Sequence, residues 1–153
     1  MKKLAFIIPL LTMLFLFPLK ALAVDFSIDQ TQIDAYLQED GNVKVQEQHT
    51  YSFEGQFNGI TRTLIPKKGT AIKNFKAEEK GRSLKIKKDG SFYKVYRSGS
   101  DESVTITLSY TIENGVEVYS DAAQFYWPFF DKSNESTYHE LSITIHPPNL
   151  SKT

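Results

Sequence analysis

A long run of alternating side chains between residues 42 and 66 constrains the fold of this chain more than any other stretch. If the run is extended, one face carries apolar and aromatic side chains with a carboxylate and an imidazole among them: Val43, Val45, Glu47, His49, Tyr51 and Phe53. The residues between them form a wholly polar face: Lys44, Gln46, Gln48, Thr50 and Ser52. This period of two predicts a β-strand with one buried face. At about 3.3 Å per residue it would be roughly 36 Å long, so we expect a bulge or bend in it.

Tight-turn dipeptides divide the rest of the chain into similar segments. Four of them join aspartate or asparagine to glycine: Asp40-Gly41, Asn58-Gly59, Asp89-Gly90 and Asn114-Gly115. Such pairs suit the positive φ angles of a two-residue hairpin turn. The sequence therefore predicts successive antiparallel hairpins.

Alternating apolar residues place further strands around these turns. We expect strands at residues 26–37, 82–88, 92–97, 104–112, 116–119 and 138–145. Residues 72–80 fit either a short helix or a short strand, and we favour the strand. Seven or eight short strands without a long helix predict an all-β domain. We expect an antiparallel β-sandwich of the immunoglobulin-like kind in preference to a closed barrel.

We make one further prediction for the first of these strands and one for the last. In the first strand the apolar residues change phase, which predicts a bulge near Gln30 and Thr31. In the last strand Leu141, Ile143 and Ile145 share one phase, and we expect them to be buried.

The first 23 residues have the layout of a secretory signal peptide. Two lysines precede an apolar run over residues 4–19, and a small-x-small cleavage pattern ends at Ala23. We expect residues 1–23 to be removed and residues 24–153 to form one exported domain. The alternative is an uncleaved membrane anchor, although two prolines interrupt the run. The chain has no cysteine, which excludes thiol chemistry and favours the extracellular or extracytoplasmic face of a bacterial membrane.

The charges of the chain are segregated along the sequence. Residues 62–97 contain 12 basic and 3 acidic residues, whereas the rest of residues 24–153 contains 3 basic and 15 acidic ones. One explanation is that basic and acidic strands lie side by side and pair across the sheet. The other is a basic face that meets anionic lipid headgroups or a cell-wall polymer. An exported domain is not expected to bind nucleic acid.

The order of several motifs resembles a known family. The motifs are Asp40-Gly41, Val43-x-Val45-x-Glu47, Tyr51-x-Phe53-x-Gly55-x-Phe57-x-Gly59-x-x-Arg62 and Ile65-Pro66, followed later by Phe125-Tyr126-Trp127. Over residues 26–148 the chain resembles the N-terminal domain of bacterial predicted membrane proteins in domain-of-unknown-function family 2207. The resemblance implies a signal peptide, an extracytoplasmic β domain and transmembrane helices after it, and it brings no established activity. This chain ends at Thr153 without such an apolar span, so we expect a truncated sequence or a soluble paralogue.

Glu47 and Arg62 are candidates for a structural ion pair. Glu47 lies in phase with the apolar face, where an unpaired carboxylate would be costly. Arg62 follows the Asn58-Gly59 turn, so the returning chain can bring its guanidinium opposite that carboxylate. We expect a bidentate pair that holds the strand register. The functional alternative is a ligand-binding arginine or an acidic catalyst.

The densest aromatic cluster is a candidate binding surface. It contains Phe125, Tyr126, Trp127, Phe129 and Phe130. Strand alternation buries only about half of such a segment. The cluster is therefore either a core plug around Trp127 or an exposed platform for a sugar, a partner or the membrane surface.

Metal and catalytic sites are not expected. Asp131-x-Ser133-x-Glu135 has the spacing of a calcium loop but lacks its glycine and its final glutamate. His139 lacks the second histidine of a zinc-binding helix, and His49 is in phase with the core. No nucleophile elbow or phosphate-binding glycine loop is recognisable. We expect no metal, no cofactor and no enzymatic activity.

These observations favour a non-enzymatic, extracytoplasmic interaction or sensing domain of a cell-surface or membrane protein. Its expected partner is a membrane surface, a cell-wall polymer or a protein. An alternative is a cell-wall polysaccharide-binding module that uses the aromatic cluster with Lys85 and Lys87 of the basic segment. A further alternative is a hydrolase whose site the sequence does not display.

Overall fold

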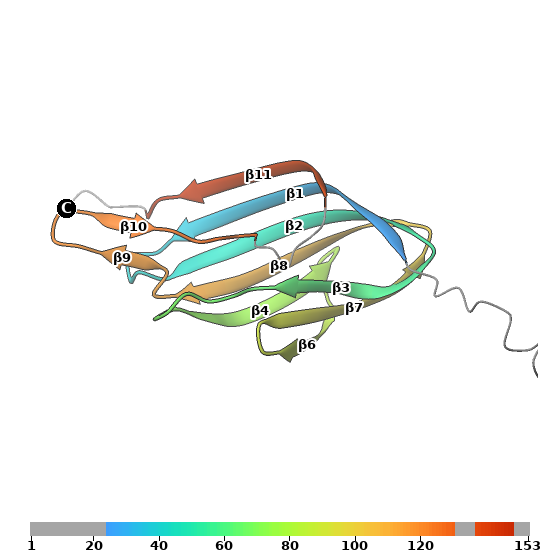
Figure 1. Cartoon of the computed structure of the whole chain (residues 1–153), viewed down its shortest axis with the longest axis horizontal. Coiled ribbons are helices and arrows are strands. Elements are labelled where there is room, and N and C mark those ends of the chain that lie inside the picture. The colour runs from blue at the N-terminus through green and yellow to red at the C-terminus, as the bar shows by residue number, and fades with distance from the viewer. Residues whose placement is uncertain (1–23, 131–136, 149–153) are drawn as a thin grey trace, which may run out of the picture.

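The computed structural model describes residues 24–130 and 137–148, and this part of the chain contains eleven strands and no helix (Figure 1). The strands are β1 (Asp25–Leu37), β2 (Val43–Glu54), β3 (Gln56–Thr63), β4 (Ala71–Glu79), β5 (Arg82–Ser83), β6 (Lys85–Asp89), β7 (Phe92–Ser100), β8 (Ser103–Glu113), β9 (Val116–Val118), β10 (Ala123–Phe125) and β11 (Tyr138–His146). The predicted all-β class is confirmed. The expected signal peptide and the candidate calcium ligands Asp131, Ser133 and Glu135 lie outside the described residues.

The observed strands differ from the expected seven or eight strands in several places. The ambiguous segment at residues 72–80 is strand β4, as favoured, but residues 82–88 are divided between β5 and β6, which belong to different sheets. Strand β3 was missed because Asn58-Gly59 was expected to be a hairpin turn, and this prediction is wrong. The pair lies inside β3, where a register shift between Phe57 and Gly59 interrupts the alternation, and the chain turns at Gly55 instead. Strand β10 has only three residues, too few to show a period.

The strands form two facing layers (Figure 1). One layer is a six-stranded sheet in the order β11-β1-β2-β8-β4-β5, the other is a three-stranded sheet in the order β3-β7-β6, and β9 and β10 form a separate hairpin. Buried apolar side chains of both sheets meet between the layers. Neighbouring strands are antiparallel, as predicted, except that the edge strand β11 runs parallel to β1. This arrangement is an all-β sandwich, and it does not confirm the immunoglobulin-like kind.

The long strand β2 has the alternation expected from the sequence. Its six inward side chains are buried, and the polar residues between them are exposed or half-buried. The bulge expected in β2 is absent from its pairing with β8, which runs without a register shift. The irregularity lies in β1 instead, where the register against β2 shifts between Ile28 and Gln30. This confirms the bulge predicted for the first strand, and it places both Ile28 and Ile33 on the buried face.

Strand β11 contradicts the expected burial of its apolar residues. Leu141, Ile143 and Ile145 are 46%, 43% and 43% exposed. They are paired with inward-facing residues of β1, but β11 is the outermost strand of its sheet. The narrower three-stranded sheet lies towards the β8–β4 side of the six-stranded one, away from β11 (Figure 1). The alternation of apolar residues therefore identified the inward face of β11 correctly, but it did not show whether another element covers that face.

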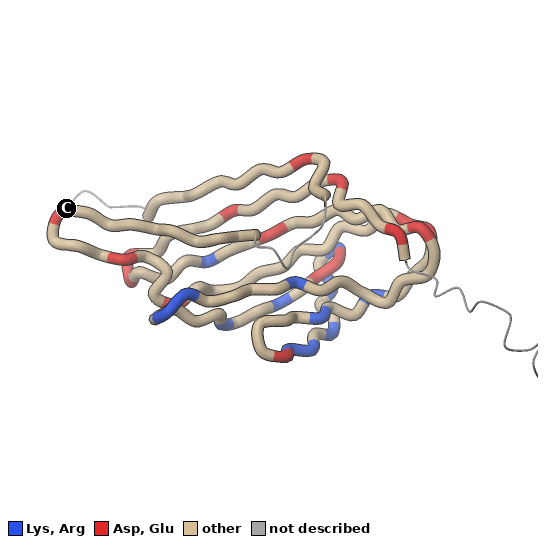
Figure 2. The backbone as a smooth tube through the Cα atoms, viewed as in Figure 1, with Lys and Arg blue, Asp and Glu red and all other residues tan. Residues whose placement is uncertain are grey.

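The charge segregation is visible along the backbone, with lysines and arginines gathered on the three-stranded sheet and its neighbours (Figure 2). Part of it is explained by pairing between nearby strands: Arg97 forms ion pairs with Glu79 and Glu102, and Lys73 with Glu113. Pairing across neighbouring strands of one sheet thus holds for Lys73 and Glu113. Arg97 of β7 instead joins the two sheets through Glu79 of β4, and Glu102 lies in the β7–β8 connection. Neither kind of pairing accounts for the lysines of β6.

Candidate functional site

A buried ion pair joins the two sheets. Glu47 lies on β2 and Arg62 on β3, and both are almost completely buried. Arg62 Nε donates to Glu47 Oε2 at 2.8 Å, and Arg62 Nη2 donates to Glu47 Oε1 at 2.9 Å. Arg62 Nη2 also donates to the carbonyl oxygen of Phe129 at 2.6 Å. The structure therefore brings the two residues together in the two-bond geometry that the sequence suggested.

Glu47 has two further partners in the core. The hydroxyl of Tyr110 on β8 donates to Glu47 Oε1 at 2.7 Å, and His49 Nε2 lies 2.9 Å from Oε2. A carboxylate only accepts hydrogen bonds, so Nε2 of His49 carries the hydrogen. In a neutral ring Nδ1 then accepts from the hydroxyl of Thr31, 3.0 Å away on β1. The network thus connects four strands through buried polar atoms.

The two charges of the network hold each other ionised. Burial alone would raise the pKa of Glu47, but the charge of Arg62 and the hydrogen bonds from His49 and Arg62 lower it to about 2. Burial would lower the pKa of Arg62, but the charge of Glu47 outweighs this and raises it. The pKa of Tyr110 is well above its ordinary value, first because it is buried and second because Glu47 is negative. At neutral pH the network is a carboxylate–guanidinium pair beside a neutral phenol.

This ion pair predicts a loss of stability in acid. The pKa of Glu47 is about 2 in the folded chain and near 4.5 when unfolded, so its contribution is complete above pH 4.5 and is lost as the pH falls towards 2. The loss is on the order of 3 kcal/mol. Urea unfolding at a series of pH values should show a free-energy difference between the wild type and Glu47→Gln that shrinks below pH 4.5. A difference that stays constant down to pH 2 would contradict the ionised pair.

A groove of about 610 Å³ lies beside this network. Its walls are mainly apolar and aromatic, and they come from β1, β2, β3 and the start of β11: Phe26, Ile28, Tyr51, Phe53, Phe57, Ile60 and Tyr138. The buried residues His49 and Arg62 are also among its lining residues. Seven consecutive residues of β3, 56–62, line the groove. Since alternate side chains of a strand point to opposite faces, the groove runs along the edge of β3.

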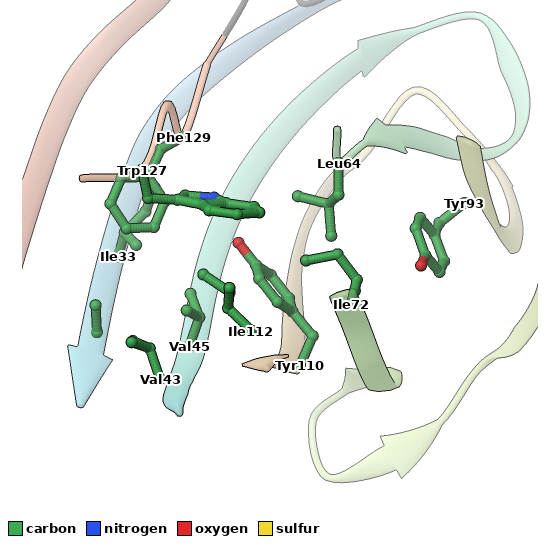
Figure 3. Close-up of a cluster of buried hydrophobic side chains, with 11 residues drawn as sticks. Ile33, Val43, Val45, Leu64, Ile72, Tyr93, Tyr110, Ile112, Trp127 and Phe129 are labelled. Carbon is green, nitrogen blue, oxygen red and sulfur yellow. The ribbon is translucent and has the colours of Figure 1, made fainter. Parts of the chain in front are cut away.

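The aromatic cluster predicted as a binding surface is divided between core and surface. Trp127 and Phe129 are each 8% exposed, and they pack between the sheets with residues of β1 and β2 (Figure 3). Phe125 and Phe130 are partly buried against the same core, and Tyr126 is 62% exposed. The segment is therefore mainly a core plug, and Tyr126 by itself does not form a platform.

The predicted basic residues lie on another surface. Lys85 and Lys87 belong to β6, at the opposite edge of the three-stranded sheet from β3. They are exposed on its outer side, whereas Trp127 and Phe129 are between the layers. The structure does not bring the lysines and the aromatic cluster into one site.

The groove was not recognised from the sequence because its residues come from four strands. Among them, Tyr51, Phe53 and Phe57 gave a usable signal, since they are aromatic residues on both sides of one strand connection. Phe53 and Phe57 stack with ring centroids 3.8 Å apart. Phe26 and Tyr138 were not predictable, because only the pairing of β1 with β2 and β11 places them there.

Two further properties concern the described residues only. Within residues 24–130 and 137–148, no three histidine, cysteine, aspartate or glutamate residues lie close enough together to hold a metal ion. Nδ1 of His139 on β11 lies 3.7 Å from Oδ1 of Asp29 on β1, and both side chains are exposed. The same ranges contain no helix of the length and hydropathy needed to span a membrane.

Comparisons with known proteins match one family. A family model described as "Predicted membrane protein (DUF2207) N-terminal domain" matches residues 27–153. The comparison with curated proteins finds no match. Similar solved structures include the M1 zinc metallopeptidase from Deinococcus radiodurans (TM-score 0.44) and a variant of it bound to a Tyr-Ser-Ala substrate (TM-score 0.45). Both are 13% identical over 56% of this chain, and the match spans only 20% of their length, so this likeness carries no argument about function.

Proposed function

This chain belongs to the family of predicted membrane proteins defined by the DUF2207 N-terminal domain, and we propose that it is a non-enzymatic interaction module outside the cytoplasm. Its ligand would be an extended segment of a partner protein that carries apolar or aromatic side chains. The signal-peptide layout of residues 1–23 supports export. The remainder of the proposal depends on the groove.

The observation that carries the proposal is that the groove follows the open edge of β3. Strand β3 pairs with β7 on one side and is the outermost strand on the other. An edge strand presents backbone donors and acceptors that an added strand can use. The neighbouring aromatic walls would then receive alternate side chains of the added segment, which is how strand addition gains specificity. Phe26, 50% exposed at the groove, is available for such a contact.

The chemistry of the groove supports binding and gives little support to catalysis. Two of its buried ionisable residues, His49 and Arg62, are held by Glu47 in the network between the sheets. The third, Tyr51, has a raised pKa, first because it is buried. Glu47 itself is completely buried and ionised, so it is poorly placed to exchange protons with a substrate. A hydrolase remains the weaker alternative for this reason.

The structure also gives less support to a polysaccharide-binding module. That function would use the aromatic cluster together with Lys85 and Lys87. Trp127 and Phe129 are buried, and the lysines lie on a different surface. A stacking platform for sugars needs exposed ring faces, which these two residues do not offer.

The proposal can be tested with a phage-displayed library of random linear peptides selected on the immobilised chain. We expect enrichment of peptides with alternating apolar or aromatic residues. Synthetic copies should bind the wild type and should bind Phe26→Ser about tenfold more weakly, because the exposed ring contributes to the groove wall. Fluorescence anisotropy of the labelled peptide measures the affinity.

Tyr119→Ser is the matched control. Tyr119 is 54% exposed, close to the 50% of Phe26, but it lies outside the groove. Its replacement should leave peptide affinity unchanged. Failure to enrich any alternating peptide, or equal loss of affinity in both variants, would overturn the proposal.

A further inference from the structure

Three lysines lie side by side on the outer face of the three-stranded sheet. In the ladder between β6 and β7, Lys85 is opposite Tyr96, and Lys87 is opposite Lys94. The intervening pair of Ile86 and Val95 faces the core. Because side chains of a strand alternate, the lysines and Tyr96 share the opposite, outward side.

These lysines are not neutralised within the described part of the chain. Ion pairs there occupy Arg62, Lys67, Lys73 and Arg97, but within the described residues no carboxylate lies within ion-pair distance of Lys85, Lys87 or Lys94. Two lysines directly opposite each other repel, so the pair of Lys87 and Lys94 reduces the stability of the sheet. An external anionic partner would remove this repulsion.

Exposed aromatic rings accompany the lysines on the same face. The ammonium groups of Lys85 and Lys94 lie 5.6 and 5.3 Å from the ring centroid of Tyr96. Phe92, 52% exposed, is opposite Asp89 at the end of the ladder next to the β6–β7 turn. Lysines with adjacent aromatic rings are typical of surfaces that contact the headgroup region of a membrane.

We propose that this face, formed by Lys85, Lys87, Lys94, Phe92 and Tyr96, docks onto an anionic lipid bilayer. The lysines contact lipid phosphates, and the ring of Phe92 enters the headgroup region. A bilayer is favoured over a wall polymer because the residues lie on the outside of a sheet, which presents them side by side to a broad surface. The chain belongs to a family of predicted membrane proteins, so we expect a bilayer surface close to it. This inference goes beyond the proposed function and uses the other edge of the sheet, so either can fail without the other.

Sedimentation with lipid vesicles tests the proposal. The chain from Val24 onward is used, because it contains every described strand and both core clusters. It should bind vesicles of phosphatidylcholine with phosphatidylglycerol, bind pure phosphatidylcholine weakly, and lose affinity as salt is raised. Replacing Lys85, Lys87 and Lys94 together with glutamine should lower the partition coefficient on the order of 100-fold.

The matched control replaces three lysines on the outer face of the six-stranded sheet, Lys44, Lys73 and Lys76. It removes the same charge and should lower binding far less. Phe92→Ser keeps all lysines and should weaken binding several-fold. Circular dichroism confirms that each variant is folded. Equal loss in both triple variants, absence of binding to the anionic vesicles, or salt-sensitive binding to purified wall polysaccharide in place of vesicles would overturn the proposal.

Discussion

Replacing Glu47 with glutamine is expected to lower the free energy of unfolding by about 3–5 kcal/mol. Glutamine has nearly the same shape but no charge, so the buried guanidinium of Arg62 would lose the carboxylate that compensates it. Tyr110 and His49 would also lose their charged acceptor. For a domain of this size the melting temperature should fall by roughly 10–20 °C. Urea and thermal unfolding followed by circular dichroism measure both quantities.

An exposed ion pair serves as the control. Glu117 lies 3.1 Å from Lys67, with side chains 50% and 30% exposed, so Glu117→Gln should cost less than about 1 kcal/mol. The double variant Glu47→Leu with Arg62→Met should be more stable than Glu47→Gln alone, because no charge remains buried without a partner. A Glu47→Gln variant that melts like the wild type would refute the structural role of the pair.

Replacing Gly59 with alanine is expected to cost more than about 3 kcal/mol. Gly59 sits at the register shift in β3 with φ of 137°, a conformation that side chains disfavour. An added Cβ would lie 1.9 Å from the carbonyl oxygen of Val95 on β7. That oxygen is backbone, so relief requires β3 and β7 to separate. Because Gly59 and Arg62 are on the same strand, the shift would also disturb the ion pair and the groove. Thermal unfolding of the purified variant checks the expected loss.

Gly55→Ala separates the cost of a disfavoured φ angle from the cost of the steric clash with β7. Gly55 also has a positive φ, 87°, but an added Cβ there meets no atom within 4 Å. Its replacement should therefore cost only the free energy of placing a side chain at a positive φ, about 1–2 kcal/mol. If both variants lost the same stability, the close approach of β3 to β7 would not be the cause.

Features governed by local alternation were predictable. The inward face of β2, the strand β8 and the bulge in β1 all follow from the period of the apolar residues. The pairing of Glu47 with Arg62 could also be anticipated, because a carboxylate on an apolar face requires a partner. The turn that returns the chain lies at Gly55, however, and not at Asn58-Gly59. Of the four glycine dipeptides, Asp40-Gly41 and Asp89-Gly90 lie at hairpins, as predicted. Asn58-Gly59 lies inside β3, and Asn114-Gly115 joins β8 to β9, which belong to different sheets.

Features governed by which strands become neighbours were not predictable. The exposure of Leu141, Ile143 and Ile145 depends on the width of the opposite sheet, and the groove depends on the position of β3 at an edge. The separation of the aromatic cluster from Lys85 and Lys87 has the same origin. A sequence periodicity specifies which side of a strand is apolar, but it contains no information about what lies against that side.

By itself, therefore, the amino-acid sequence determined most of the longer strands, their apolar faces and the buried charge that needed compensation, since these depend on neighbours along the chain. The tertiary structure alone decided the parallel pairing of β11, the open edge beside the groove and the gathering of lysines on one outer face. These arise from contacts between strands distant in sequence, which no local pattern encodes.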